Sequence, residues 1–254
     1  MKTMKNTLLA RKLVVLISFG FICFWNNIAN AQEVEIIPIE HASTLLLHGN
    51  TTIYIDPVGE AEWYANYPSP DLVLITDIHW DHFNPKTLGA LIQEGTTIIT
   101  PQAVADKMTP ALLAKTSILA NGGVINSNGI SIEAIPMYNL REEALDFHTK
   151  GRGNGYVITI DQKRIYFSGD TEDIEEMRSL KNIDMAFVCM NLPYTMTENS
   201  AAAAVIAFSP KKVYPYHYRG KPNVSDVALF KTLIEKSNAK VEVIQLDWYP
   251  RDQF

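Results

Sequence analysis

Four potential metal ligands stand within six residues of this chain, directly after an apolar run from Leu72 to Thr76. They are Asp77, His79, Asp81 and His82. The apolar run predicts a strand buried on both faces, and Asn84-Pro85 beyond the cluster predicts the start of a helix. A loop between the two can turn several side chains toward one point, whereas a regular helix or strand would point them apart. Imidazole and carboxylate together suit zinc, iron or manganese, so the segment predicts a metal site rather than an ordinary solvated loop.

Short apolar, β-branched stretches alternate with helical patterns along the rest of the chain. Strands are expected near residues 33–39, 42–47, 51–55, 72–76, 129–135, 155–160, 163–168, 184–190, 211–216 and 240–246. Helices are expected near residues 85–93, 102–108, 172–180, 197–208 and 225–237. Strand-rich halves with interspersed helices indicate two sheets packed together and covered by helices. Periodicity alone does not define the strand order.

The first 31 residues have the order of a secretory signal peptide. A basic leader with Lys2 and Arg11 precedes an apolar run from Leu13 to Trp25, and Ala29-Asn30-Ala31 offers a small-x-small cleavage site. The run is short for a membrane span, so an uncleaved anchor is the weaker interpretation. Cys23 does not indicate a lipoprotein, because bulky residues precede it. We therefore expect cleavage after Ala31, a single domain over residues 32–254, and a periplasmic or secreted protein without stable membrane insertion.

The composition of the remaining chain narrows its partners. Four of the 22 basic residues and none of the 28 acidic ones lie in the leader, so residues 32–254 carry 18 basic and 28 acidic residues, a net charge of −10. A phosphate backbone would repel such a surface, which argues against nucleic acid and favours a small-molecule substrate. Cys189 is the only cysteine after position 31, so no disulfide within the domain is expected. The oligomeric state is not predicted.

The segment from Asp77 to His82 resembles the HxHxDH signature of the metallo-β-lactamase superfamily. Further parts of the chain are similar to that family: Asp56-Pro57 after a strand, His148 in Phe147–Gly151, Ser168–Thr171 with Asp170, and His217 after Tyr214–Tyr216. Tyr138-Asn139 and Tyr194–Thr197 look most like the branch of L-ascorbate-6-phosphate lactonase. The resemblance implies a mixed α+β chain folded as a four-layer αββα sandwich.

The resemblance also implies a ligand set for two divalent metal ions. Asp77, His79 and His148 would bind the first ion, Asp81, His82 and His217 the second, and Asp170 would bridge the two. Zinc leads by family, and manganese or iron remain candidates, because Asp77 replaces the first histidine of the signature and a carboxylate hardens the site. An alternative is that Asp77 only holds a ligand in place, leaving one tight and one weak site.

Four more residues are candidates for contacts around the metals. His41 lies in a turn between early strands and is a candidate for substrate contact or for an ordinary hydrogen-bonded histidine. Asp56 is expected to orient a ligand histidine rather than to bind metal. Tyr194 and Arg219 flank the ligand loops and could hold an anionic group or simply pack there. The glycine-rich run at 151–155 lacks the lysine and helix of a phosphate-binding loop and is interpreted as a turn that lets His148 reach the metals.

These residues predict a hydrolase that uses a metal-bound hydroxide on a small ester, lactone or phosphodiester. Asp81 and Asp170 are the candidates for guiding the proton. No G-x-S-x-G pattern is present, which argues against a serine nucleophile. The alternative from another class is a metal-binding or ligand-binding protein of the same fold with weak or no turnover, which the substitution at Asp77 would explain.

Overall fold

The first half of the chain forms a sheet of six strands in sequence order. The computed structural model describes residues 32–252. The strands of this sheet are β1 (Glu35–Glu40), β2 (Ser43–His48), β3 (Thr51–Ile55), β4 (Leu72–Leu74), β5 (Thr97–Thr100) and β6 (Thr116–Ile118). β1 to β3 pair antiparallel, and β4 to β6 continue the sheet in parallel. The apolar run before the ligand cluster is thus a strand inside a sheet, with every residue of β4 buried.

The second half forms a sheet of seven strands in reverse sequence order. Its strands are β7 (Val124–Ser127), β8 (Ile130–Met137), β9 (Gly153–Ile160), β10 (Lys163–Phe167), β11 (Met185–Cys189), β12 (Lys212–Tyr216) and β13 (Glu242–Val243). β7 to β10 pair antiparallel, whereas β10 to β13 run parallel. Because parallel strands share one carboxyl end, the loops after β10 and β12 emerge at the same edge.

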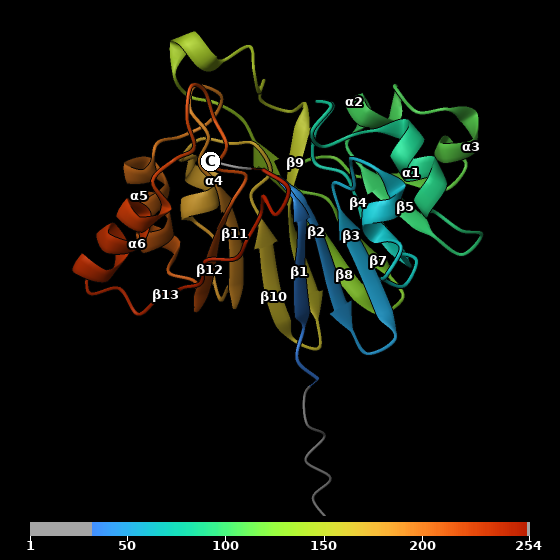
Figure 1. Cartoon of the computed structure of the whole chain (residues 1–254), viewed down its shortest axis with the longest axis horizontal. Helices are drawn as coiled ribbons and strands as arrows, with labels where there is room; N and C mark the ends of the chain where they lie inside the picture. Colours follow the sequence, from blue (N-terminus) through green and yellow to red (C-terminus); the bar gives the residue numbers. More distant parts are fainter. Residues whose placement is uncertain (1–31, 253–254) are drawn as a thin grey trace, which may run out of the picture. The chain divides into compact units, whose positions relative to one another are not determined.

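Helices cover the outer face of each sheet (Figure 1). They are α1 (Pro85–Leu91), α2 (Gln102–Ala105) and α3 (Pro110–Leu113) beside the first sheet, and α4 (Glu175–Arg178), α5 (Glu198–Phe208) and α6 (Val227–Lys236) beside the second. Short 3₁₀ turns, η1 (Ala61–Tyr64) and η2 (Glu142–Ala144), lie in the loops. One buried cluster joins the inner faces of both sheets and extends to α5 and α6, and a second joins the outer face of the first sheet to α1, α2 and α3. The layers therefore run helix, sheet, sheet, helix, and the predicted αββα sandwich is confirmed.

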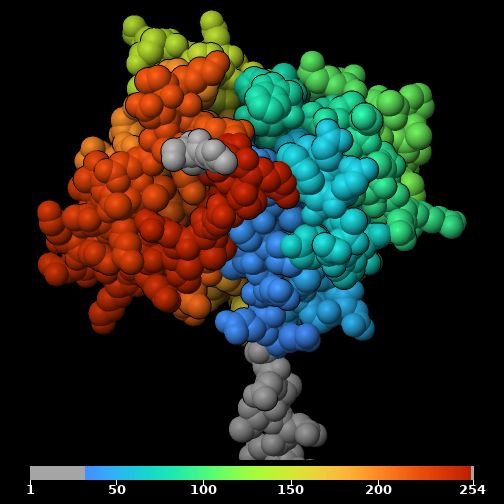
Figure 2. All heavy atoms as spheres, viewed as in Figure 1, coloured from blue at the N-terminus to red at the C-terminus, as the bar shows by residue number. Residues whose placement is uncertain are grey.

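The C-terminal segment returns across the molecule to the first hairpin. Figure 2 shows the red C-terminal residues lying against the blue and cyan surface of the first sheet. The backbone N–H of His41 donates to the carbonyl of Trp248 at 3.0 Å, and Arg251 donates to the carbonyl of Ile39 at 2.7 Å. This segment thereby fixes the turn that holds His41.

The predicted elements are present, with ends shifted by a few residues. Four elements between residues 97 and 127 were not predicted: β5, α3, β6 and β7. β6 and β7 are three and four residues long and largely half-exposed, so they lack a continuous apolar pattern. Within residues 32–252, no helix has the length and apolar character needed to cross a membrane. The expected signal peptide lies outside the described residues.

Candidate metal centre

The loop after β4 carries four of the predicted ligands. They are Asp77, His79, Asp81 and His82. Beyond β4 the chain turns back sharply, because the carbonyl of His79 accepts hydrogen bonds from the backbone N–H groups of His82 at 3.0 Å and Phe83 at 2.8 Å. The side chain of Asn84 then caps α1. A buried strand on one side and a capped helix on the other hold this short loop in place.

Three further predicted ligands lie at the ends of elements of the second sheet. Asp170 follows β10, His217 follows β12, and His148 lies in the loop before β9. Gly169 has φ +59°, and a Cβ there would lie 2.5 Å from Sδ of Met137. The turn that presents Asp170 therefore requires glycine.

The ligand atoms gather in three groups, and within each group all of them lie within 4.8 Å of one another. The groups are Asp77 with His79 and His148, then His82 with Asp170 and His217, and finally His41 with Asp81 and His217. Asp170 adjoins the first two groups, because its Oδ2 lies 3.1 Å from Nε2 of His148 and 3.2 Å from Nε2 of His82. All seven predicted ligands are thus brought together, although their binding of metal stays a prediction.

The second group offers nitrogen and oxygen atoms whose lone pairs could bind a cation. Nε2 of His82 faces Nε2 of His217 at 3.1 Å, and two such nitrogens can form a hydrogen bond only if one of them is protonated. Oδ1 of Asp170 is buried and accepts no hydrogen bond from any residue that the structure describes. Two imidazoles and a carboxylate aimed at one another are ligands that zinc, iron and manganese accept, so these residues fit a divalent metal.

Charge in this group shifts its pKa values in opposite directions. Burial acts to raise the pKa of Asp170, but His217, His82 and His148 hold it well below its ordinary value. Burial acts to lower the pKa of His82, but Asp170 and Asp56 raise it well above its ordinary value. The buried carboxylates therefore attract positive charge to this point.

Asp56 lies behind His82 and does not join a ligand group. Its Oδ2 accepts a hydrogen bond from Nδ1 of His82 at 2.8 Å, and its carboxylate also accepts from the backbone N–H and the hydroxyl of Thr76 at 2.7 and 2.6 Å. With Nδ1 engaged in this way, Nε2 of His82 points toward Asp170. This is the orienting position that was expected of Asp56.

Asp77 has two partners in the first group. Its Oδ2 lies 2.8 Å from Nδ1 of His79. Arg152 holds both carboxylate oxygens, with Nε 3.1 Å from Oδ1 and Nη2 2.9 Å from Oδ2. Burial favours the neutral acid, but the hydrogen bond from His79 and the charges of His79, His82 and Arg152 hold the pKa of Asp77 below its ordinary value. Asp77 is therefore a carboxylate placed as a ligand, with a guanidinium already bound to it.

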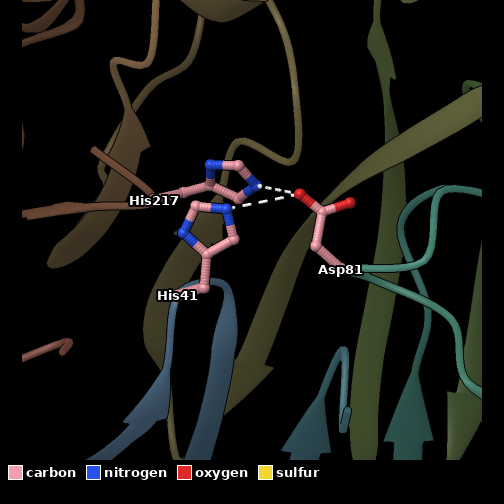
Figure 3. A group of neighbouring side chains, drawn as sticks. All are labelled: His41, Asp81 and His217. Atoms are coloured by element: carbon pink, nitrogen blue, oxygen red, sulfur yellow. Dashed lines mark ion pairs between the residues drawn. The ribbon is translucent and has the colours of Figure 1, made fainter. Parts of the chain in front are cut away.

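Asp81 faces two histidines (Figure 3). Its Oδ2 lies 3.3 Å from Nε2 of His41 and 3.5 Å from Nε2 of His217. Nδ1 of His41 lies 2.6 Å from the hydroxyl of Tyr249, which accepts a hydrogen bond from the backbone N–H of Arg219. Burial lowers the pKa of His41 to about 3, so this ring is neutral at ordinary pH. His41 thus lies at the centre as a buried, hydrogen-bonded histidine, and its contact with substrate stays a prediction.

Comparison with known proteins identifies the family. The sequence matches the family described as a beta-lactamase superfamily domain over residues 35–217. The structure aligns with the metallo-β-lactamase fold protein YhfI from Bacillus subtilis with a TM-score of 0.66 and 13% identity, over 85% of this chain and 97% of that one, which shows the fold. The chain belongs to the metallo-β-lactamase superfamily.

Two proteins with higher sequence identity also align with most of this chain. A UPF0173 metal-dependent hydrolase of Pyrobaculum islandicum is 32% identical over 227 residues, 81% of this chain and 94% of that protein. A crystal structure from Parabacteroides distasonis, provisionally assigned as a metal-dependent hydrolase, has 39% identity and a TM-score of 0.76, over 84% of this chain and 93% of that one. The likeness to the lactonase branch in particular stays a prediction.

Four predicted ligands of this metallo-β-lactamase-fold chain, His79, Asp81, His148 and Asp170, line a cavity of about 360 Å³. Aromatic side chains line it, namely Trp80, Phe147 and Tyr194. Trp80 is 76% exposed although it stands between two predicted ligands, so its ring is free to contact a bound molecule. The cavity volume lies within the range of about 300–1,000 Å³ that is typical of small-molecule sites.

Tyr194 and a nearby lysine form one side of the cavity. The Tyr194 ring packs edge-on against Phe147, and Nζ of Lys221 lies 5.9 Å from its centroid. The loop carrying Lys221 is pressed against Leu192, because a Cβ at Gly220 would lie 2.0 Å from the Leu192 carbonyl oxygen. Lys221 is exposed at the edge of the cavity and forms no ion pair with any residue in the described range.

Arg219 also lines the cavity, but its charge is already balanced. The guanidinium pairs with Glu40 and Asp252 and lies 4.9 Å from the ring centroid of Tyr249. Its backbone N–H supports Tyr249 and thereby His41. The geometry gives Arg219 a structural task, and its predicted contact with substrate stays a prediction.

Sequence analysis missed three residues at the centre: Trp80, Arg152 and Tyr249. A buried aspartate needs a cation, and this requirement could have indicated that Asp77 has a partner, although it could not have named Arg152. The run at 151–155 was interpreted only as a turn, yet it contains Arg152. No local signal connects Tyr249 with His41, which lies 208 residues earlier.

Proposed function

We propose that this chain is a metal-dependent hydrolase that holds two divalent cations and cleaves a small ester, lactone or phosphodiester. One observation carries the proposal: Oδ2 of Asp170 lies within 3.1 and 3.2 Å of ligand nitrogens from two different groups. A single carboxylate placed between two such groups is suited to joining two cations. The named activity of the Pyrobaculum islandicum relative supports the reaction class.

Two cations held there would lower the pKa of a coordinated water toward neutrality and polarise the bond to be cleaved. The chain's own residues do the rest. Asp56 fixes the ring of His82, and Asp170 remains ionised between three histidines. Asp81 is 17% exposed at the cavity, and its Oδ2 can accept a hydrogen bond from the attacking water and orient it.

The cavity and the charge of the domain restrict the substrate. A space of about 360 Å³ with aromatic walls admits a small molecule. The unpaired Lys221 at one side favours a substrate that carries a negative charge beyond the bond to be cleaved. The net charge of −10 over residues 32–254 disfavours nucleic acid. A lactone is one candidate, through the resemblance of Tyr194–Thr197 to the lactonase branch.

The alternative is a protein of this fold that binds metal or ligand without turnover. The pairing of Asp77 with Arg152 favours it, because an occupied carboxylate is a poorer ligand.

Localisation belongs to the proposal as well: cleavage after Ala31 would release a periplasmic or secreted domain beginning at Gln32. The intact mass of the protein recovered from a periplasmic extract tests this, and a mass that includes residues 1–31 would contradict it.

Turnover of a substrate panel separates the two functions. The protein is loaded with Zn²⁺ or Mn²⁺ and assayed with chromogenic esters, lactones and phosphodiesters. We expect measurable turnover of at least one substrate class. Asp170→Asn should lower this turnover by more than about 100-fold, which exceeds the loss typical of residues that only hold a metal ligand in place. Asp173→Asn is the control, because Asp173 lies three residues after Asp170 and pairs with Arg178 instead of with a ligand histidine. Bound metal with no turnover across the panel would favour the alternative.

A further inference from the structure

A permanent positive charge lies beside the first ligand group. Arg152 donates to both oxygens of Asp77, and its Nη2 also donates to the carbonyl of Phe147, which holds the guanidinium in place. The Asp77 side chain is fully buried and that of Arg152 is 18% exposed. An arginine does not lose its proton in a protein, so this charge is present at every working pH.

The second ligand group has no such partner. Among the residues that the structure describes, Asp170 of this group and the adjacent Asp81 form ion pairs only with histidines. Among the arginines and lysines that the structure describes, only Arg152 pairs with the carboxylate of a predicted ligand. No guanidinium or ammonium therefore competes with a cation for Asp170 or for the adjacent Asp81. Asp77, the carboxylate that belongs to the first group alone, is already paired with Arg152.

We propose, building on the function above, that Arg152 competes with the first cation for Asp77 and so makes the two metal sites fill in sequence. The site of His82, Asp170 and His217 fills first. The site of Asp77, His79 and His148 fills only at higher metal concentration, because a cation there must share Asp77 with the guanidinium and lie close to its charge. The amount of available metal would then control how much of the protein holds both ions.

Metal titration of the metal-free protein tests this without any substrate. Co²⁺ binding is followed by visible absorption and by calorimetry in the full chain. We expect two separate steps in the wild type. Arg152→Gln should raise the Co²⁺ affinity of the weaker step by about tenfold or more and leave the affinity of the tighter step nearly unchanged. Substituting a residue that holds a metal ligand typically changes metal affinity on this scale. Lys150→Gln removes an exposed cation of the same loop, paired with Glu176, and should change either step by less than about threefold.

The opposite sign would overturn the inference. If Arg152 only orients Asp77 as a ligand, Arg152→Gln weakens the step instead of tightening it. Two steps of equal affinity in the wild type would overturn it as well. If Arg152→Gln does not fold, Arg152→Lys keeps the charge but loses the two-pronged contact; a smaller tightening supports the inference and a weakening overturns it.

The outcome is separable from that of the proposed function. Equal, tight binding of two ions together with turnover would contradict the competition at Asp77 and leave the hydrolase standing. Sequential binding that Arg152→Gln converts to tighter binding, without turnover on any substrate, would contradict the hydrolase and leave the competition standing.

Discussion

Replacing Asp56 by asparagine tests how the second ligand group is held. The two side chains have nearly the same shape, but one oxygen of the carboxylate becomes an NH₂ group. In the structure Oδ1 accepts from the backbone N–H of Thr76, and Oδ2 accepts from Nδ1 of His82 and from the Thr76 hydroxyl. Whichever way the amide turns, two donors face each other in a fully buried position.

The cost follows from that mismatch. A buried donor left without an acceptor costs about 1–3 kcal/mol. His82 can escape the mismatch by moving its proton to Nε2, but this removes the lone pair that would bind metal. Either way we expect the affinity for the tighter metal ion to fall by about 10–100-fold, or about 1.4–2.7 kcal/mol. Competition with a chromophoric chelator for Zn²⁺ measures the change directly.

Asp71→Asn is the matched control. Oδ2 of Asp71 accepts a backbone hydrogen bond from Thr52 at 2.8 Å in the same sheet, with no histidine involved. It should leave Zn²⁺ affinity unchanged, even if the free energy of unfolding falls by a similar amount. A folded Asp56→Asn protein that binds Zn²⁺ like the wild type would refute the reasoning.

Three further predictions concern stability and chemistry away from the ligands. Gly220→Ala should lower the free energy of unfolding by about 1–3 kcal/mol, because its Cβ would press into a backbone carbonyl. Gly89→Ala has open space at an exposed position of α1 and should raise the free energy of unfolding by about 0.5–1 kcal/mol. Chemical denaturation compares the two variants. Burial raises the pKa of the Cys189 thiol to about 12, so in a Cys23→Ser background a thiol reagent should label the unfolded protein but not the native one at pH 8; rapid native labelling would contradict this burial. Burial acts to raise the pKa of Asp184, but hydrogen bonds from a lysine and a backbone N–H hold this pKa below its ordinary value of 3.8. The stability that the Asp184 carboxylate contributes is therefore present above pH 3.8 and is lost as the pH falls below that value. Asp184→Asn should therefore be less stable than the wild type at pH 7 and equal to it in strong acid, and a difference independent of pH would speak against this.

The strand before the ligand cluster and the cluster itself were predictable because their signals are local, whereas the four-layer arrangement was inferred from the family resemblance. The run Leu72–Thr76 is nearly continuously apolar, and its first three residues form the fully buried strand β4. The donors that follow it are close in sequence, so proximity in space needed no knowledge of topology. His148, Asp170 and His217 come from distant parts of the chain, and their place at the centre was inferred through the family resemblance.

The remaining features depend on contacts between distant segments. Arg152 meets Asp77 across 75 residues, and Tyr249 meets His41 across 208. The charge state and partner of a buried carboxylate depend on which side chain the fold places beside it, and neither composition nor periodicity encodes this. The short strands β6 and β7 escaped prediction for a different reason, since pairing with a neighbouring strand, rather than an apolar pattern, holds them in the sheets.

The metal content of the purified domain tests the central claim most directly. Elemental analysis is made at saturating Zn²⁺ or Mn²⁺ for the wild type and for Asp170→Ala, which removes the carboxylate that adjoins both ligand groups. We expect about two ions per chain in the wild type and a clear loss in the variant. One ion or none in the wild type, unchanged by the substitution, would contradict a centre built around Asp170.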